Sequence, residues 1–316
     1  MTHVIGVDLG GTKTAAGVVS SSGEVLFSNT IPTLNRAGGE AILDATAALV
    51  AGLVGRAADA GLTVSGVGVG SAGVIDAVAG SVVSATDAIR GWAGTALVSG
   101  LSTRVGLKVR AVNDVHAHAL GEAWLGAAAC TSSSLMVAFG TGVGGSFVLD
   151  GAPVLGHRFV GGHVGHFASP LAVVDGKPLP CVCGSAGHVE AVASGPAIHE
   201  SFLRLGGSAA EATDTRGVFE LAKKTHDGGA AAAAARAAVE LGAVAAGQAV
   251  GGLINILDPE TVVISGGLAD AGELWWKPME AALRQELLAP LLAVPVVRAA
   301  LGNSAAIIGA AKLVLP

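Results

Sequence analysis

The chain has 316 residues, of which 51% are hydrophobic and 13% are charged. This composition excludes intrinsic disorder, because a chain so rich in apolar residues can bury a substantial core. The formal net charge of −6 argues against a nucleic-acid partner, since no basic stripe is available to neutralise phosphates. Three cysteines are too few for a disulfide framework and fit a reducing, cytoplasmic compartment.

The chain has no recognisable targeting or membrane segment. Residues 1–11 contain no basic region followed by an apolar run, so no signal peptide is predicted. The uncharged stretch 123–149 is interrupted by polar residues and glycines, and the stretch 241–257 is too short for a comfortable membrane span. We therefore expect a soluble protein without a membrane partner, in which 241–257 is part of a buried helix.

The first half of the chain alternates short apolar strands with segments of helical spacing. The predicted strands are 4–9, 14–19, 25–27, 64–69 and 107–112, and the predicted helices are 39–58, 94–103 and 115–125. The first two strands flank a tight glycine turn. Asp114 is the expected cap of the helix that begins at 115.

The opening pattern returns near the middle of the chain. A strand at 135–139 leads into a glycine turn at 140–145 and a second strand at 146–149. One such strand–turn–strand unit in each half indicates an internal duplication. A long alanine-rich helix at 230–257 and a strand at 261–265 follow, and this alternation predicts an α/β fold.

Two glycine turns, 10–13 and 140–145, follow buried strands and could present backbone N–H groups to phosphate oxygens. The second formally matches the dinucleotide pattern G-x-G-x-x-G, but the residues after it read as a strand rather than a helix. The first lacks the spacing of a Walker A motif. Hairpin turns without a ligand are the alternative, which the further pair Gly266-Gly267 weakens.

Three carboxylates stand at positions where chemistry is expected. Asp8 interrupts an apolar strand beside the first glycine turn, and either Mg²⁺ bound through water or hydrogen bonds to the turn would account for it. Asp114 follows Asn113 at a strand end, where it could accept a hydroxyl proton, cap the next helix, or do both. Glu190 follows a cysteine-rich loop, and a plain surface acid is its alternative.

The segment 161–187 has little periodicity, as functional loops often have. A Cys₂His₂ set suited to tetrahedral zinc lies in and just after it: His166, Cys181, Cys183 and His188. Four protein ligands leave no open position, so the metal would be structural. The alternative is a loop with two free thiols and two solvent-facing histidines.

Taken together, these motifs resemble the ROK family (repressors, open reading frames, kinases) of sugar kinases over essentially the whole chain. The matching segments are 7–13 for the first phosphate motif, 112–114 for the catalytic segment, 139–145 for the second phosphate motif, 165–166 with 181–190 for the zinc and sugar segment, and 263–267 for the adenosine motif. The resemblance implies an actin-like (ribonuclease H-like) ATPase fold, with two α/β domains around a central cleft. The implied domains are residues 1–114, completed by a C-terminal helix at about 303–316, and residues 115–302, which carry the zinc and sugar loop.

The resemblance also assigns roles to individual residues. Asp114 would be the general base for the sugar 6-hydroxyl, and Asn113, His166 and Glu190 would hold ring hydroxyls. The residues assigned to ATP and Mg²⁺ are Asp8, Gly10, Gly11, Thr12, Lys13, Gly140, Thr141, Gly142, Gly266 and Gly267, and those assigned to structural Zn²⁺ are His166, Cys181, Cys183 and His188. Phosphoryl transfer needs mostly positioning and charge neutralisation, for which this set is sufficient. Dimers are common in the family, so a homodimer is expected.

Three departures from the family pattern bear on the substrate and the metal. The family usually has E-x-G-H where this chain has His163-Val164-Gly165-His166, and a histidine at this place resembles some bacterial N-acetylmannosamine kinases. Loss of that carboxylate weakens the case for glucose, because a neutral histidine offers different hydrogen bonds. The third zinc cysteine of the family is His188 here, and zinc accepts both. Asp87 would stand in for a sugar-contacting asparagine that these kinases often carry.

The expected function is an ATP-dependent kinase for the 6-hydroxyl of a hexose or N-acetylhexosamine, with N-acetylmannosamine ahead of N-acetylglucosamine and glucose. Polyphosphate, which some relatives use, stays open as the donor. The alternative from another class is a sugar-sensing ROK regulator, but such proteins carry an N-terminal helix-turn-helix and the first strand here begins at Val4. A non-catalytic sugar-binding protein is the third alternative, against which Asp8 and Asp114 count.

Overall fold

The computed structural model describes residues 2–86, 88–224 and 229–315, and it divides into two compact units. Unit 1 consists of Met1–Ser132, Ser146–Gly162 and Ala299–Pro316, and unit 2 of Ser133–Gly145 and His163–Arg298. The chain therefore passes from one unit to the other four times. The two-domain division after Asp114 stays a prediction, and helix α3 (Asp114–Leu125) belongs to unit 1, where it packs against the last helix, α9 (Ala305–Lys312).

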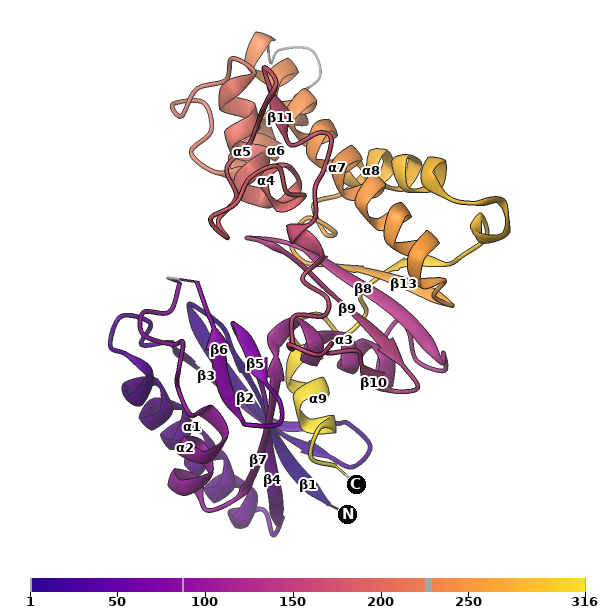
Figure 1. Ribbon diagram of the computed structural model, residues 1–316. Helices are drawn as coiled ribbons and strands as arrows, with labels where there is room; N and C mark the ends of the chain where they lie inside the picture. Colours follow the sequence, from indigo (N-terminus) through magenta and orange to yellow (C-terminus); the bar gives the residue numbers. More distant parts are fainter. Residues whose placement is uncertain (1, 87, 225–228, 316) are drawn as a thin grey trace. The chain divides into compact units, whose positions relative to one another are not determined.

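The first sheet has the strand order β3-β2-β1-β4-β7 (Figure 1). Its strands are β1 (His3–Leu9), β2 (Lys13–Ser20), β3 (Val25–Pro32), β4 (Val64–Ser71) and β7 (Lys108–Asn113). β2 runs antiparallel to β1 and to β3, whereas β4 runs parallel to β1 and to β7. The carboxyl ends of β1, β4 and β7 therefore meet at one edge of the sheet, which is where ligand-binding residues gather in α/β folds.

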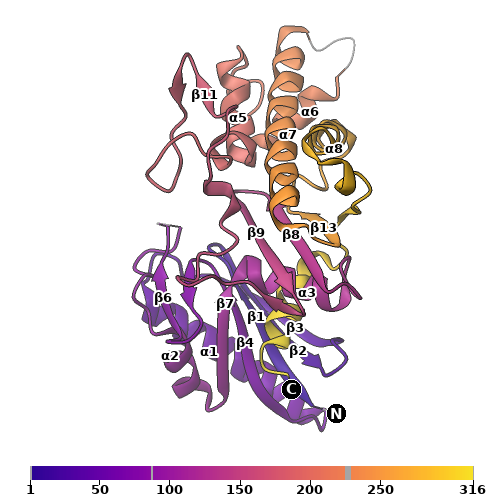
Figure 2. The same ribbon diagram turned by 45° about the vertical axis from the view of Figure 1, so that its right-hand side comes forward.

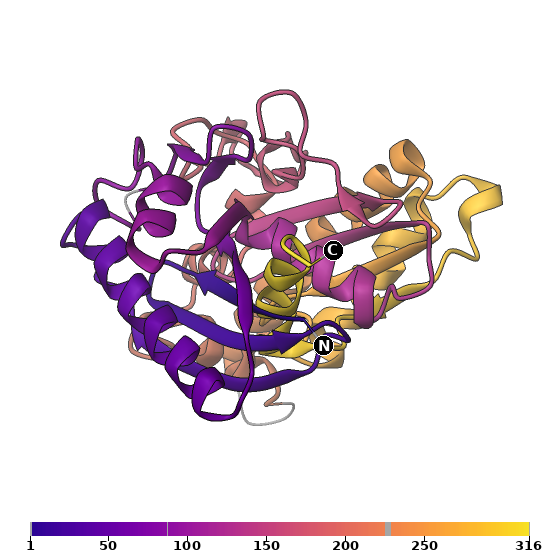
Figure 3. The ribbon, with the colours of Figure 1, turned by 90° about the horizontal axis from the view of Figure 1, so that it is seen from below.

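Helices cover both faces of this sheet, because alternate residues of β1 point to opposite sides. Ile5, Val7 and Leu9 pack in one core cluster with α1 (Gly39–Asp59) and α2 (Leu97–Val105). Val4 packs instead with Ile307 and Ala311 of α9. Figure 3 shows α1 and α9 on opposite sides of the indigo strands.

Helix α9 approaches the sheet so closely that glycines are required beneath it. A Cβ on Gly6 of β1 would overlap the Ile307 carbonyl, and a Cβ on Gly68 of β4 would overlap the Ala310 carbonyl. The backbone of the helix thus lies directly on the backbone of the strands. This contact helps to explain why a chain poor in aromatic residues is so rich in glycine.

The second sheet has the order β10-β9-β8-β13-β14 (Figure 2) and repeats the topology of the first. Its strands are β8 (Ser133–Phe139), β9 (Val143–Leu149), β10 (Ala152–Pro153), β13 (Thr261–Ser265) and β14 (Val296–Arg298). β10 runs antiparallel to β9, and β13 runs parallel to β8 and to β14. The duplicated strand–turn–strand unit and the α/β fold class predicted from the sequence are therefore present.

The remaining elements surround these sheets. In unit 1 they are the hairpin β5 (Val74–Asp76) and β6 (Ser81–Ser84) and the 3₁₀ turn η3 (Gly302–Ser304); in unit 2 they are η1 (Val164–His166), β11 (Val173–Val174), β12 (Lys177–Pro178), α4 (Glu190–Ala193), α5 (Gly195–Arg204), α6 (Thr215–Ala222), α7 (Gly229–Leu257), α8 (Glu273–Glu286) and η2 (Ala289–Leu291). Two helices, α1 and α7, are long and apolar enough to cross a membrane by length and composition alone. α7 packs against α5, α6 and α8, as the core helix of a globular unit does.

Candidate active site and metal centre

Asp8 and Asp114 lie at the carboxyl ends of strands on either side of β4, within unit 1. Asp8 pairs with Gly70 of β4, and Gly70 pairs in turn with Val112, two residues before Asp114. A Cβ on Gly70 would lie 2.7 Å from the Ala117 Cβ and 3.4 Å from the Asp114 Cα. The glycine thus lets the start of α3 approach β4, and the structure brings together the two carboxylates that the sequence predicted.

The electrostatics of this pair favour a bound cation. The pKa of Asp8 is raised from 3.8 to about 6, mainly by burial and then by the Asp114 carboxylate, while the Lys13 ammonium opposes both. Two neighbouring carboxylates in a poorly solvated place repel each other, and a hard divalent cation relieves that repulsion. The donor set therefore fits the predicted Mg²⁺.

Asp8 is expected to make the stability of the protein depend on pH. Its carboxyl has a pKa of about 6 when folded against 3.8 as its ordinary value, so the folded state binds more protons between these values. The free energy of unfolding therefore falls as the pH rises from about 4 to about 6. Asp8→Asn removes this cost and should stabilise the magnesium-free protein at pH 7 by ~3 kcal/mol, at ~1.4 kcal/mol per pKa unit.

Thermal unfolding of the wild type and Asp8→Asn in magnesium-free buffer at about pH 4 and pH 7 checks this expectation. The variant should gain several degrees in Tm at pH 7 and little at pH 4. An equal gain at both pH values would contradict the electrostatic cause.

Asn113, rather than Asp114, is the cap residue of α3, which corrects the predicted cap. The Asn113 Oδ1 accepts a hydrogen bond from the Val115 N–H at 2.9 Å, and its Nδ2 donates to the Gly73 carbonyl at 2.9 Å. Asp114 Oδ1 also lies 2.9 Å from the Val115 nitrogen. Both polar atoms of the Asn113 side-chain amide therefore hydrogen-bond to backbone groups. These bonds fix the position of the backbone at Asp114.

The first glycine turn is held by a segment that the sequence analysis did not single out. Thr33 Oγ1 donates to the Gly10 carbonyl at 2.8 Å, and its backbone N–H donates to the Thr12 carbonyl at 3.0 Å. Asn35 Nδ2 donates to the Gly11 carbonyl at 2.8 Å. Successive carbonyls of the turn are thus occupied, and the shape of the predicted phosphate-binding turn is fixed before a ligand arrives.

The second glycine turn is tied to Glu190 within unit 2. Glu190 is buried, and its Oε2 accepts a hydrogen bond from the Val143 N–H at 2.6 Å. A Cβ on Gly142 would lie 2.7 Å from the same oxygen, so only glycine leaves room for the carboxylate. The interpretation of Glu190 as a plain surface acid is therefore wrong, and its carboxylate links the predicted sugar segment to the predicted phosphate turn.

The pair Gly266-Gly267 follows β13 at the end of the second sheet. Gly266 has a φ of +85°, and a Cβ there would overlap the Phe139 carbonyl at the end of β8. The Leu268 N–H donates to that same carbonyl at 3.1 Å. The predicted adenosine motif thus lies at the strand end from which the second glycine turn leaves.

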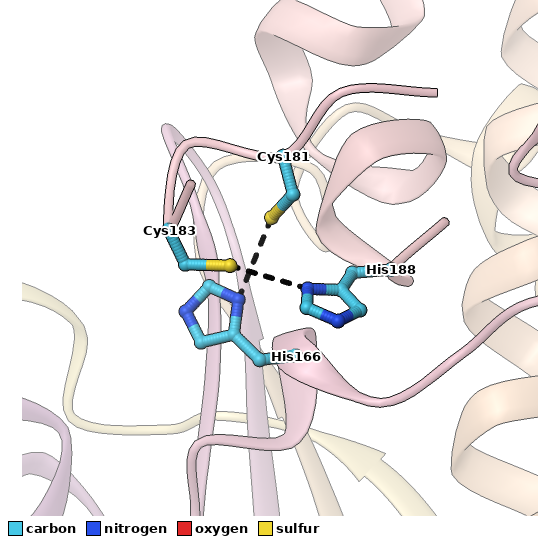
Figure 4. Close-up of side chains that lie close together, drawn as sticks. All are labelled: His166, Cys181, Cys183 and His188. Carbon is cyan, nitrogen blue, oxygen red and sulfur yellow. Dashed lines mark hydrogen bonds between the residues drawn. The ribbon is translucent and has the colours of Figure 1, made fainter. Parts of the chain in front are cut away.

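The four predicted zinc ligands converge in unit 2 (Figure 4). One ligand atom from each of His166, Cys181, Cys183 and His188 lies within 4.8 Å of the other three. Cys181 Sγ is 3.6 Å from His166 Nδ1, and Cys183 Sγ is 3.3 Å from His188 Nδ1. Zinc bonds of about 2.1 Å to nitrogen and 2.3 Å to sulfur fit within a set of this size.

The environment of the cluster supports metal binding. Burial lowers the pKa of His166, which keeps its imidazole neutral and able to bind a metal. Burial raises the pKa of the Cys181 thiol, and a bound Zn²⁺ would reverse that by stabilising the thiolate. Two isolated β-bridges, Ala168 with His188 and Pro180 with Ala186, hold the ligand-bearing parts of the loop together.

Of the two further predicted sugar-binding residues, the structure describes His163 but not Asp87. His163 precedes η1, and the centre of its ring lies 6.3 Å from that of His166. Asp87 lies outside the described residues. Sequence reasoning missed buried His116, whose Nε2 lies 2.7 Å from the Gly161 carbonyl oxygen, because a helical histidine beside apolar residues carries no motif.

Sequence reasoning also missed Glu122, a buried carboxylate of α3. It accepts hydrogen bonds from the backbone N–H groups of Ala127, Ala300 and Leu301 at 2.8–3.1 Å. A carboxylate with several such donors is a stable structural anchor. It fixes the chain just before α9 to the helix that begins at Asp114.

A family profile described as "ROK family" matches residues 4–316. The chain belongs to the ROK family. Among its relatives, a glucokinase of Thermotoga maritima is 33% identical over 98% of this chain and 96% of its own length. An N-acetyl-D-glucosamine kinase of Citrobacter koseri is 31% identical over 98% of both chains.

The solved structures that resemble this ROK protein include a ROK family glucokinase from Streptomyces griseus in complex with glucose and AMPPNP. It has a TM-score of 0.79, is 31% identical and covers 98% of both chains. The family resemblance and the actin-like ATPase fold predicted from the sequence are therefore confirmed.

Proposed function

We propose that this protein is an ATP-dependent kinase that phosphorylates the 6-hydroxyl of a hexose or N-acetylhexosamine. This chain is a carbohydrate kinase, since its relatives over nearly its whole length include glucokinases and N-acetylglucosamine kinases. The observation that carries the proposal is the meeting of Asp8 and Asp114 at the ends of the two strands that flank β4, beside the first glycine turn.

The proposed reaction assigns one task to each group. The sugar 6-oxygen attacks the γ-phosphorus, the bond from that phosphorus to the bridging oxygen of ADP breaks, and Asp114 takes the hydroxyl proton. The backbone N–H groups of the turns at Gly10 and Gly140 would hold the phosphates. Mg²⁺, when bound with ATP, would offset phosphate charge, with Asp8 orienting its water ligands.

Binding of the sugar is assigned to Asn113, His166 and Glu190, with His163 and Asp87 as further candidates. An imidazole at position 163 offers an N–H donor, whereas a glutamate carboxylate there would only accept hydrogen bonds. Because a histidine at this place resembles some bacterial N-acetylmannosamine kinases, the proposed substrate is N-acetylmannosamine, ahead of N-acetylglucosamine and glucose. Zinc would hold the loop that carries His166, and we keep a cytoplasmic homodimer as part of the proposal.

Release of ADP with MgATP and each of glucose, mannose, N-acetylglucosamine and N-acetylmannosamine tests the substrate. N-acetylmannosamine should give the highest kcat/KM, and the rate without sugar is the background to subtract. A higher kcat/KM for glucose would contradict the role given to His163 and leave the kinase intact. No release with any of the four sugars would favour a regulator or a non-catalytic binding protein.

A further inference from the structure

A cavity of about 460 Å³ on unit 1 is lined by positively charged side chains that have no role in the proposed reaction. Its lining residues are Asn35, Arg36, Ala88 and Arg90. Two of these carry guanidinium groups and none of these described residues carries a carboxylate, although the whole chain has 24 acidic residues against 18 basic ones. The cavity therefore concentrates positive charge on an acidic protein.

The two loops that supply the arginines are tied to each other. The Arg90 N–H donates to the Asn35 carbonyl at 2.8 Å, so Arg90 is placed beside the residue that precedes Arg36. Trp92 anchors the second loop, because its ring is fully buried and its Nε1 donates to the Ala72 carbonyl at 3.0 Å. Both arginines thus extend from fixed backbone.

Neither arginine is used to stabilise the fold. Within the described part of the chain, the guanidinium groups of Arg36 and Arg90 form no ion pair or hydrogen bond, whereas arginines of α2, α5 and α8 pair with glutamates. Two positive charges that line one cavity repel each other, and an anion between them is attracted by both. The arrangement is that of a binding site rather than of a structural contact.

The cavity borders the proposed catalytic machinery. Asn35 connects it to the first glycine turn through the 2.8 Å hydrogen bond to Gly11. On the other side, a Cβ on Gly11 would lie 3.5 Å from the Ala88 Cβ. A group held by the two arginines would therefore lie beside the first glycine turn.

We propose that this cavity is an oxyanion site, in which Arg36 and Arg90 hold a phosphate or carboxylate group of a substrate other than the phosphoryl group transferred. Guanidinium groups match such oxyanions with paired N–H donors. Two sources supply this chemistry: an anionic substituent on the sugar, or the phosphate chain of a donor longer than ATP. The proposal rests on the proposed function for the nature of the substrate, but binding of the anion requires no turnover.

Calorimetric titration of the full chain tests the site. The ligands are glucose 1-phosphate beside glucose, N-acetylmuramic acid beside N-acetylglucosamine, and inorganic tripolyphosphate. The proteins are the wild type, Arg36→Gln, Arg90→Gln and the control Arg56→Gln. Arg56 is exposed over the Phe27 ring in the last turn of α1, about 25 Å along the helix from its start, and should leave every affinity unchanged.

If the sugar is the source of the anion, an anionic sugar binds the wild type more tightly than its neutral parent does. Its affinity then falls about 10-fold in Arg36→Gln and in Arg90→Gln, but not in Arg56→Gln. The same loss confined to tripolyphosphate identifies the donor. Equal affinities in all four proteins for every ligand would overturn the site. If the wild type releases no ADP with any sugar, the proposed kinase function is contradicted. The oxyanion site is not contradicted by that result, because its test measures binding alone.

Discussion

Asp114→Asn is expected to reduce kcat by about 10³-fold, the usual contribution of a positioned general base. The amide is close in size to the carboxylate but cannot take the proton of the sugar hydroxyl. The fold should survive, because Asn113 caps α3 and its amide bonds to Gly73 and Val115 do not involve the Asp114 side chain.

The measurement is kcat at saturating MgATP and sugar, with calorimetric binding of the sugar as a separate readout. Asp59→Asn is the matched control, because Asp59 is exposed at the end of α1 and should leave kcat unchanged. Wild-type turnover in Asp114→Asn would remove Asp114 from the mechanism. Loss of both turnover and sugar binding would give it a binding role instead of a role as base.

Removal of the metal is the second change with a large expected effect. Protein prepared without chelators should contain about one zinc per chain, and Cys181→Ser should lose it together with many degrees of Tm. The reason is that Cys181 is buried and its loop carries only the short strands β11 and β12. A structural zinc contributes directly to the folding of such a segment.

Cys130→Ser is the matched control, since Cys130 is the one cysteine outside the cluster and is exposed. It should keep its zinc and its Tm. His188→Cys should also keep the zinc, because thiolate and imidazole both bind it. Elemental analysis and thermal unfolding check all three variants, and a metal-free wild type with an unchanged Tm would contradict the assignment.

Local sequence patterns were enough to predict much of the fold. Each strand–glycine turn–strand unit joins short apolar runs through turn residues, so β1, β2, β8 and β9 were found to within a few residues. The zinc set was found in the same way, because three of its four ligands lie within eight residues. The hairpin of β5 and β6 was not found, since its strands have three and four residues.

Contacts between distant segments could not be predicted from these patterns. Asn35 reaches Gly11 across 24 residues, and Glu122 reaches Leu301 across 179. Nothing in the composition near Glu122 marks it as buried, because its partners are backbone N–H groups that every residue type carries. The arginine cavity was missed for the same reason, since it exists only where two loops are joined by a backbone hydrogen bond.

The position of α9 also has a consequence for how the protein is made. A ribosome completes all of unit 2 before it adds the helix that covers Gly6 and Gly68, so during synthesis this part of the first sheet is uncovered while unit 2 can already fold. Nascent chains that stop before Ala305 would expose apolar strands to aggregation and to chaperones. The first sheet is therefore finished only after the residues of α9 have been added.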